Sequence, residues 1–251
     1  MNNSISHSAL RDYQKCPLLY FYRHHLKIQI PESSIHLVFG KALHYALEMH
    51  TKQKMNMVNT FKSAFKPDGL SYEDKLKFND FMETGILQLK NYEGFLPGIQ
   101  QMYGLTIMES EKRFELKNIV SPLSKTPLKF SQINGVIDFS TIYKKLGDYK
   151  TSSHKYTQAE VDESLQPTIY YLDYWMKNKE LPKGFIYVVF LKKRKRDSIQ
   201  MIETHRTLED LENLVLLMNE IHTKVELKQF ERSHDSSAFC DCYRYEEALT
   251  I

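Results

Sequence analysis

Two segments of the chain place apolar residues at helical spacing, and both predict amphipathic helices. The first runs from 37 to 51 and the second from 208 to 227. Their inward positions are Leu37, Phe39, Leu43, Ala46 and Leu47 in the first segment and Leu211, Leu214, Val215, Met218, Ile221 and Val225 in the second. A third, long helix is predicted from 157 to 178, with Pro167 as a kink inside it.

Strand patterns occupy the middle of the chain. Residues 105–116 partly alternate and predict the first strand. Residues 184–191 are continuously apolar between Pro182 and Lys192, which is typical of a buried central strand. Residues 199–205 predict a return strand. We therefore expect an α/β fold with a small mixed sheet and helices on both sides.

Residues 135–151 predict a β-hairpin, because two β-rich runs flank a polar turn at 143–145. Folding the chain there places Asp138 opposite Asp148, and Lys150 shares the face of Asp148 because side chains alternate along a strand. Adjacent carboxylates repel unless a cation lies between them, so the pair predicts a site for Mg²⁺ or Mn²⁺. A surface hairpin with solvated charges is the alternative.

These three side chains fit phosphodiester hydrolysis. A divalent metal lowers the pKa of a bound water and stabilises a leaving oxygen. Lys150 would orient that water or neutralise charge on the phosphoryl oxygens. Asp138, Asp148 and Lys150 are therefore the catalytic candidates.

Two further features are candidates for binding. His44 lies one helical turn after Gly40, which leaves room beside the imidazole for a metal or another element, although a core histidine is the alternative. Lys192, Lys193 and Arg194 begin a run of five cations. A nucleic-acid backbone is their natural partner, and a solvated turn is the alternative.

The chain resembles the PD-(D/E)xK nucleases, in particular the RecB-like and Cas4-like exonuclease branch. The resemblance rests on motifs in the family's order: Ser8, Leu10, Tyr13, Cys16, Pro17 and Tyr20; Phe39, Gly40 and His44; Gly135 to Phe139; Asp148 to Thr151; and Gln166 with Tyr170.

The resemblance implies the PD-(D/E)xK core as one domain over 1–251, with a helical insertion at about 52–103. It implies metal ligation by His44, Asp138, Asp148 and the backbone carbonyl of Tyr149. It also implies that Gln166 and Tyr170 contact the substrate. Relatives often carry a glutamate on the first strand, so Glu111, or Glu109, is a weaker metal candidate, with a solvent-facing acid as the alternative.

The C-terminal tail, about 230–251, contains Cys240 and Cys242. Many members of this branch join such cysteines to one like Cys16 and hold a [4Fe–4S] cluster. Four thiolates are normally required, and the chain has only three cysteines, so a complete cluster is not expected. A zinc site completed by His234 is one alternative; a metal-free clasp between the termini is our expectation.

Composition sets broad limits. The chain of 251 residues is 42 % apolar, enough for one large domain, and its net charge of +3 does not by itself decide nucleic-acid binding. It has no apolar run of about 18 residues and a polar N-terminus, so we expect no membrane association. An odd number of cysteines favours a reducing, cytoplasmic setting.

The expected function is a metal-dependent DNA exonuclease in repair, recombination, phage or mobile-element processing, or CRISPR adaptation, with protein partners in such complexes. A virus- or phage-encoded origin is compatible with so compact a chain. Two alternatives stay open: a catalytically weak nucleic-acid-binding component of a larger complex, and a restriction-type endonuclease.

Overall fold

The computed structural model describes residues 4–30, 34–193, 198–233 and 240–249. A mixed sheet of six strands forms its centre, in the order β1-β3-β4-β5-β6, with β2 also paired to β3. The strands are β1 (Ser4–Ser6), β2 (Ile107–Lys117), β3 (Gln132–Thr141), β4 (Lys145–Ser152), β5 (Gly184–Leu191) and β6 (Ile199–Thr204). The β1–β3 and β4–β5 pairs are parallel and the others are antiparallel.

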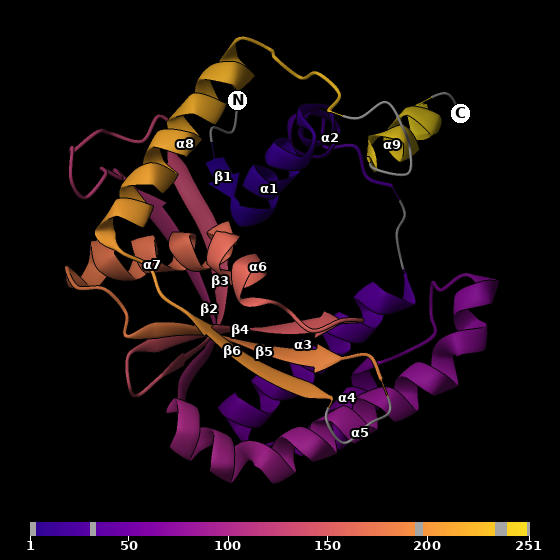
Figure 1. The fold of residues 1–251 in the computed structure, drawn as a ribbon. Helices are drawn as coiled ribbons and strands as arrows, with labels where there is room; N and C mark the ends of the chain where they lie inside the picture. Colours follow the sequence, from indigo (N-terminus) through magenta and orange to yellow (C-terminus); the bar gives the residue numbers. More distant parts are fainter. Residues whose placement is uncertain (1–3, 31–33, 194–197, 234–239, 250–251) are drawn as a thin grey trace.

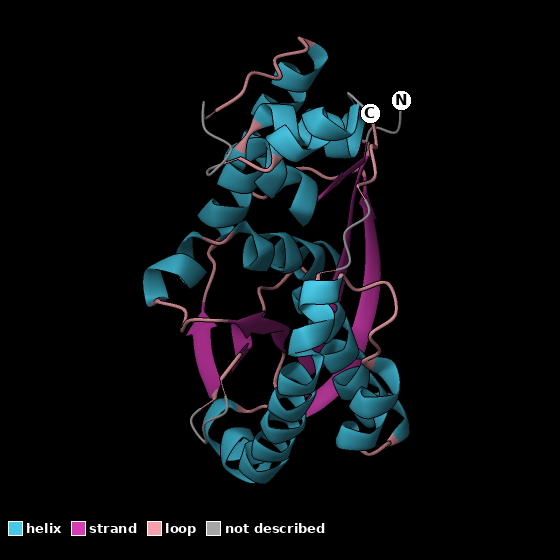
Figure 2. Cartoon of the chain, turned by 90° about the vertical axis from the view of Figure 1, so that its right-hand side faces the viewer, coloured by secondary structure: helices cyan, strands magenta, loops and turns pink. Residues whose placement is uncertain are grey.

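Helices lie between the strands along the chain and after the last of them (Figure 1). They are α1 (His7–Lys15), α2 (Pro17–Tyr20), the π-helix η1 (Phe21–His25), α3 (Ile35–Gln53), α4 (Met57–Ala64), α5 (Tyr72–Tyr103), α6 (Gln158–Glu163), α7 (Leu165–Asn178), α8 (Leu208–Glu226) and α9 (Cys242–Leu249). Figure 2 shows groups of helices above and below the strands.

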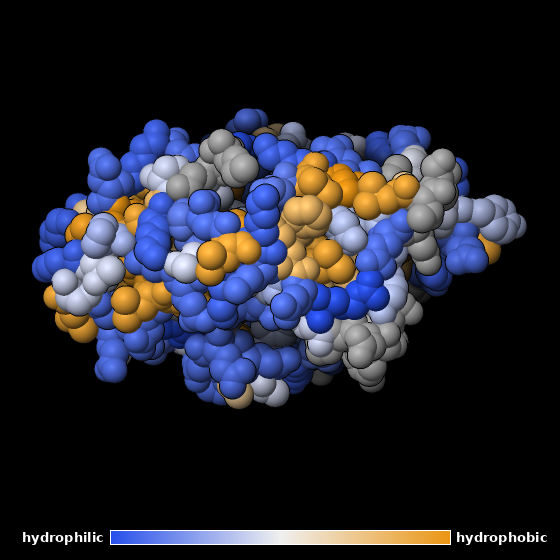
Figure 3. All heavy atoms as spheres, turned by 90° about the horizontal axis from the view of Figure 1, so that it is seen from above, coloured by the Kyte–Doolittle hydropathy of each residue, from blue (hydrophilic) through white to orange (hydrophobic). Residues whose placement is uncertain are grey.

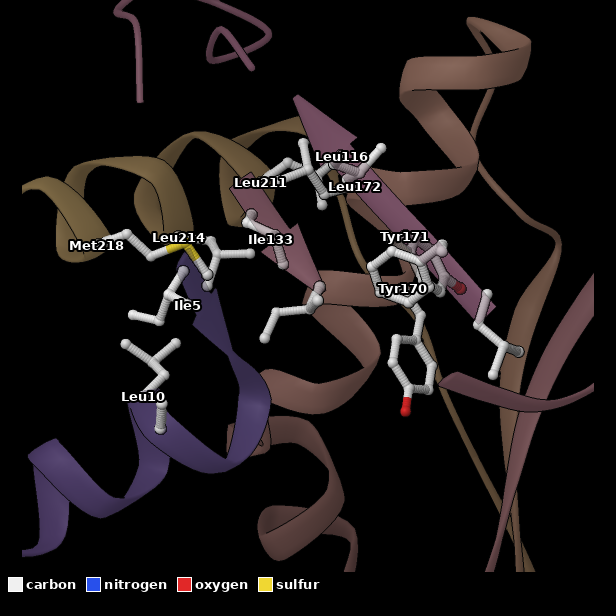
Figure 4. Close-up of a cluster of buried hydrophobic side chains, with 14 of the residues drawn as sticks. Ile5, Leu10, Leu116, Ile133, Tyr170, Tyr171, Leu172, Leu211, Leu214 and Met218 are labelled. Carbon is white, nitrogen blue, oxygen red and sulfur yellow. The ribbon is translucent and has the colours of Figure 1, made fainter. Parts of the chain in front are cut away.

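Two hydrophobic cores hold these layers together. In one core, α1, α7 and α8 pack on the sheet, and Ile5 and Leu10 face Leu214 and Met218 of α8 (Figure 4). In the other, α3, α4 and α5 pack on the opposite side of the sheet, with Phe39 and Phe61 among its fully buried side chains. The expected mixed sheet with helices on both sides is therefore confirmed.

The helical segment at 52–103 forms part of this second layer. Leu89 and Tyr92 of α5 are buried in the same core as Phe190 of β5. The side chain of Gln88 donates a hydrogen bond to the carbonyl of Leu191. Helix α5 therefore packs against β5, the strand that lies beside β4.

Strand β3 has three partners, and this decides where a gap opens in the sheet. β2 pairs with β3 along the whole of β3, so it fills one edge. β1 pairs with residues 132–134, and β4 pairs with Phe139 and Ser140. Both must share the other edge, which leaves residues 135–138 without a neighbouring strand there.

The predicted hairpin is confirmed. Phe139 lies opposite Gly147 and Ser140 opposite Leu146, and the pairing ends there, so that Asp138 and Asp148 are the next residues along the two strands. The turn occupies 142–144, one residue earlier than predicted, because Lys145 already pairs with Gly184 of β5.

The single helix predicted for 157–178 is wrong. The helix is interrupted at Ser164, whose backbone is extended: α6 ends at Glu163 and α7 starts at Leu165. The buried Arg206 donates hydrogen bonds to the carbonyls of Val161 and Ser164 and so satisfies the groups that the break exposes. Pro167 falls in the first turn of α7, where a missing N–H costs no helical hydrogen bond.

Other predictions need smaller corrections. Leu37 is 44 % exposed, and Ile35 and Ala42 instead complete the buried face of α3. The strand predicted first, 105–116, is β2, because the three-residue β1 precedes it and is too short to show a pattern.

The described helices include none that is long and apolar enough to cross a membrane. The face seen from above is largely hydrophilic, with its apolar residues in separate patches (Figure 3).

Glu212 of α8 fastens the loop that precedes β3. Its carboxylate accepts hydrogen bonds from the backbone N–H groups of Leu123 and Ser124 and from the Ser124 hydroxyl. These hydrogen bonds, led by that of the Ser124 side chain, lower the pKa of Glu212 to about 2. Because the folded pKa lies below the ordinary value of 4.5, the stabilisation is present above pH 4.5 and is lost as the pH falls toward 2.

We expect Glu212→Gln to lower the melting temperature at pH 7, because the neutral amide is a weaker acceptor. The difference from the wild type should shrink as the pH is lowered from about 4.5 toward 2. Circular-dichroism melts across this range would measure it, with Glu220→Gln, an exposed site on the same helix, as the control. A difference that stays constant with pH would contradict this assignment.

Candidate active site

Side chains occupy the gap on the edge of β3. The hydroxyl of Tyr170 donates to the carbonyl of Val136 over 2.5 Å, and the backbone N–H of Tyr149 donates to Asp138 Oδ2 over 2.8 Å. Asp138 is therefore held between β3 and β4 at the point where the ladder stops.

Gly147 lets the two strands approach at this point. A Cβ atom there would lie 2.0 Å from the Phe139 ring and 2.7 Å from the carbonyl oxygen of Ile186. No side chain fits that space without moving the backbone. Close packing, and not a catalytic role, therefore requires glycine at position 147, directly before Asp148.

Asp138 forms a compact group with His44 and Glu111. His44 Nδ1 lies 3.3 Å from Asp138 Oδ2, and one ligand atom from each of the three residues lies within 4.8 Å of the other two. His44 comes from α3, and the β2–β3 register places Glu111 opposite Asp138. Glu111 has a positive φ of 50°, which is uncommon for a residue other than glycine.

Burial gives this group unusual proton affinities. Burial, and then the charge of Asp148, raise the pKa of Asp138 well above its ordinary value. Burial also raises the pKa of Glu111, and burial lowers the pKa of His44. Each shift disfavours the charged form, so acids crowded at this point lack a compensating cation within the group.

Asp148 faces a different set of partners. Its Oδ1 accepts a hydrogen bond from Gln166 Nε2 over 2.5 Å, and Lys150 Nζ lies 2.6 Å from its Oδ2. Burial opposes the charge of Lys150, but the attraction of Asp148 outweighs it and the pKa of Lys150 is raised. The side chain of Asp148 is only 3 % exposed.

Gln166 and Tyr170 connect α7 to both strands of the hairpin. Gln166 Nε2 also donates to the Tyr170 hydroxyl over 2.9 Å, so the chain of hydrogen bonds runs from Asp148 to the backbone of Val136. Both side chains are at most 5 % exposed. In this arrangement they position Asp148 against β3.

The residues fit a hard divalent metal. Within the described chain, buried Asp148 Oδ2 has no hydrogen bond of normal geometry, despite its contact with Lys150. The nearby donors are one imidazole nitrogen and carboxylate oxygens, a set suited to Mn²⁺ or Mg²⁺. The compact three-residue group contains Asp138, His44 and the weaker candidate Glu111, and Asp148 lies beside it rather than in it.

Residues of this centre line two separate cavities of similar size. One, of about 470 Å³, is lined by His44, Glu111 and Thr151, and the other, of about 480 Å³, by Lys150 and Gln166. Thr151 and Lys150 are consecutive in β4, so their side chains leave the strand on opposite sides. The catalytic candidates therefore lie between two hollows.

Of the three predicted cations Lys192, Lys193 and Arg194, the structure relates Lys192 to a cavity of the site. Lys192 Nζ lies 3.3 Å from His36 Nδ1, and His36 lines the first cavity. Lys193 follows it, with its backbone N–H donating to the Leu191 carbonyl. Arg194 lies outside the described residues. Glu109 pairs with Lys112 at 2.6 Å and is not part of the group around Asp138.

The three cysteines come together at the chain ends. Cys16, Cys240 and Cys242 are buried, and their sulfur atoms all lie within 4.8 Å of one another. A [4Fe–4S] cluster does not fit, because it needs four thiolates and the chain has three cysteines. His234 lies outside the described residues.

Sequence reasoning missed His7 and Arg11, which line the second cavity together with Lys150. Nothing in their spacing marks them as site residues. Their place depends on the pairing of β1 with β3, which has no local signal.

Comparison with known proteins agrees with this fold. Residues 4–244 match the family described as the PD-(D/E)XK nuclease superfamily. A solved structure from Eubacterium rectale, described as a "putative exonuclease", superimposes with a TM-score of 0.58 and 15 % identity over 97 % of this chain and 88 % of that chain. The solved structure of SSO0001 gives a TM-score of only 0.33, at 12 % identity over 86 % of each chain.

No curated protein matches this chain significantly. The family match nevertheless extends over almost the whole sequence, from residue 4 to residue 244. The chain belongs to the PD-(D/E)XK nuclease superfamily.

Proposed function

We propose that this protein is a metal-dependent deoxyribonuclease that degrades DNA from strand ends. One observation carries the proposal: His44, Glu111 and Asp138 converge within 4.8 Å, directly beside the Asp148–Lys150 pair. A binding protein would gain nothing from placing Asp138 and Glu111 where burial raises their pKa values, because burying a carboxylate costs free energy unless a cation compensates it.

His44, Asp138 and Glu111 would hold the metal, and Asp148 and the backbone carbonyl of Tyr149 would be further ligand candidates. A bound Mg²⁺ or Mn²⁺ would supply Lewis acidity toward a phosphodiester and its attacking water. Asp138 is held in place by the N–H of Tyr149, and Asp148 by Gln166, so neither carboxylate has to reorganise when substrate binds.

Lys150 acts next to this group. Its ammonium, 2.6 Å from Asp148, is in a position to orient a water molecule or to donate to a phosphoryl oxygen of the scissile group. Asp148 in turn fixes the direction of the ammonium. The pair therefore works as one unit, and loss of either member should be nearly as harmful as loss of both.

We propose DNA as the substrate, and a preference for its ends, because the chain resembles the RecB-like and Cas4-like branch. The same resemblance is our basis for proposing a single domain over 1–251. It is also our basis for proposing a role in repair, recombination, phage or mobile-element processing, or CRISPR adaptation. The Eubacterium rectale protein of similar fold is itself described as a "putative exonuclease".

We expect end-labelled linear DNA to be degraded with Mn²⁺ or Mg²⁺ and to stay intact with EDTA. Lys150→Ala and Asp148→Ala should each lower the rate by about 100-fold or more, because the first removes the cation that stabilises charge on the reacting phosphate and the second removes the carboxylate that fixes its direction. Lys117→Ala, an exposed cation at the far end of β2, is the matched control and should cut at the wild-type rate.

Closed circular DNA separates the remaining functions. Cleavage of circles at the rate of linear DNA would replace the exonuclease by an endonuclease. Binding of DNA without any cleavage would favour a non-catalytic component of a larger complex. Cleavage that survives both substitutions would show that the active site lies elsewhere.

Metal affinity tests the ligand group without relying on activity. We expect His44→Ala to weaken Mn²⁺ binding by at least about tenfold, because a nitrogen ligand is removed from a small donor set. His50→Ala, on the same helix but outside the group, should bind like the wild type. Isothermal titration calorimetry at pH 7.5 would measure both, and equal affinities would exclude His44 as a ligand.

A further inference from the structure

The cavity of about 480 Å³ beside Lys150 opens on the side of β4 away from His44. Lys150 and Gln166 line it, and both also contact Asp148. Its volume lies within the range of pockets that hold small ligands. A group bound there would touch the same side chains that hold the catalytic carboxylate.

Helix α1 contributes an imidazole and a guanidinium group to the lining of this cavity. His7 and Arg11 are four residues apart, so they lie on one face of α1, and both line the cavity. Burial, and then the positive charges of Lys150 and Arg11, lower the pKa of His7 to about 4. Near neutral pH, His7 is therefore an uncharged hydrogen-bond partner beside the cations Arg11 and Lys150, whose effect on it exceeds that of Asp148 and Asp12.

Arg11 is available to an anion. Its side chain is 62 % exposed, and its contact with Asp12 is long, at 3.4 Å. Asp12 itself is closer to Arg23 and His24, at 3.0 and 2.9 Å. The acids Glu160 and Glu163 also border the cavity, and the carboxylate of Glu160 accepts hydrogen bonds from the N–H and hydroxyl of Thr157.

The lining also includes an aromatic residue whose backbone is held in place. Tyr156 lines the cavity, and its backbone is clamped by Gln200 of β6. Tyr156 N–H donates to Gln200 Oε1 over 2.8 Å, and Gln200 Nε2 donates to the Tyr156 carbonyl over 2.7 Å. The ring is partly exposed, with the ring of His154 6.2 Å away. An ordered, partly exposed ring is suited to stacking on a base.

We infer that this cavity binds the nucleotide adjacent to the scissile phosphate, with its phosphate held by Arg11 and His7 and its base against Tyr156. The inference rests on the proposed function. It makes α1 part of the substrate path and assigns to Arg11 a binding role that does not involve the reacting atoms. The flanking phosphate is an internal diester or a terminal monophosphate, which share the chemistry that Arg11 recognises.

The test uses the full-length protein and a short single-stranded DNA. We expect Arg11→Gln to raise KM by about tenfold and to change kcat by less than about twofold. In an Asp138→Asn background, which prevents cleavage, anisotropy should show that Arg11→Gln reduces the slope of log affinity against log salt by about 0.7, the value for one phosphate contact. Arg11→Lys should restore much of both effects.

Controls separate this role from a general loss of charge or of folding. Lys224→Gln removes an exposed cation from α8 that pairs with Glu220, and it should match the wild type in KM and salt slope. Tyr156→Leu should weaken binding by about tenfold with an unchanged salt slope, because stacking does not release counterions. Melting curves would check that each variant is folded.

Substrates with a 5′-phosphate, a 5′-hydroxyl, a 3′-phosphate, and circular single strands identify the phosphate. An Arg11 effect on all of them in the binding assay supports an internal diester, and an effect confined to one phosphorylated end supports a terminal monophosphate. Wild-type KM and salt slope in both Arg11→Gln and His7→Gln would overturn the inference. Absence of cleavage by the wild type would instead overturn the proposed function, and the binding assay would still report on Arg11.

Discussion

Much of this molecule depends on the fact that a strand has only two edges. β2 occupies one edge of β3 throughout, so β1 and β4 must divide the other. Between them, the backbone of residues 135–138 has no strand partner on this second edge, and polar groups that face it need partners other than a strand. Tyr170 satisfies the carbonyl of Val136, while the carboxylate of Asp138 accepts the free N–H of Tyr149. The interruption of strand pairing at residues 135–138 is thus where the acidic side chain of Asp138 is buried.

The charges of the carboxylates beside this gap then limit the chemistry that the site can support. Asp138 and Glu111 are both buried enough that their pKa values rise, and each lies in the field of Asp148. The free energy lost by burying such groups is recovered only when a cation or a set of donors compensates them. Lys150 and Gln166 compensate Asp148, whereas Asp138 and Glu111 beside His44 keep raised pKa values.

Local patterns in the sequence were sufficient for the hairpin, because alternation and a polar turn fix its register and hence the approach of Asp138 to Asp148. They also fixed α3 and β5, which have strong periodicity or continuous apolar runs. They could not show the break at Ser164, because the carbonyls there are satisfied by Arg206, more than 40 residues away. Glu111 was ambiguous for a similar reason: its neighbour Glu109 has the same chemistry, and only the β2–β3 register distinguishes them.

The position of α1 is the most distant consequence of the same topology. Because β1 runs parallel to β3, its C-terminal residue Ser6 points toward the gap, and α1 begins there with Ser6 as its N-cap. An antiparallel β1 would have carried the helix away from Lys150. At its other end α1 leads to Cys16, which packs with Cys240 and Cys242, and Lys15 pairs with Asp241 at 3.0 Å. Both ends of α1 are therefore fixed by segments remote in sequence, so the C-terminal tail helps to set the wall of the cavity beside Lys150.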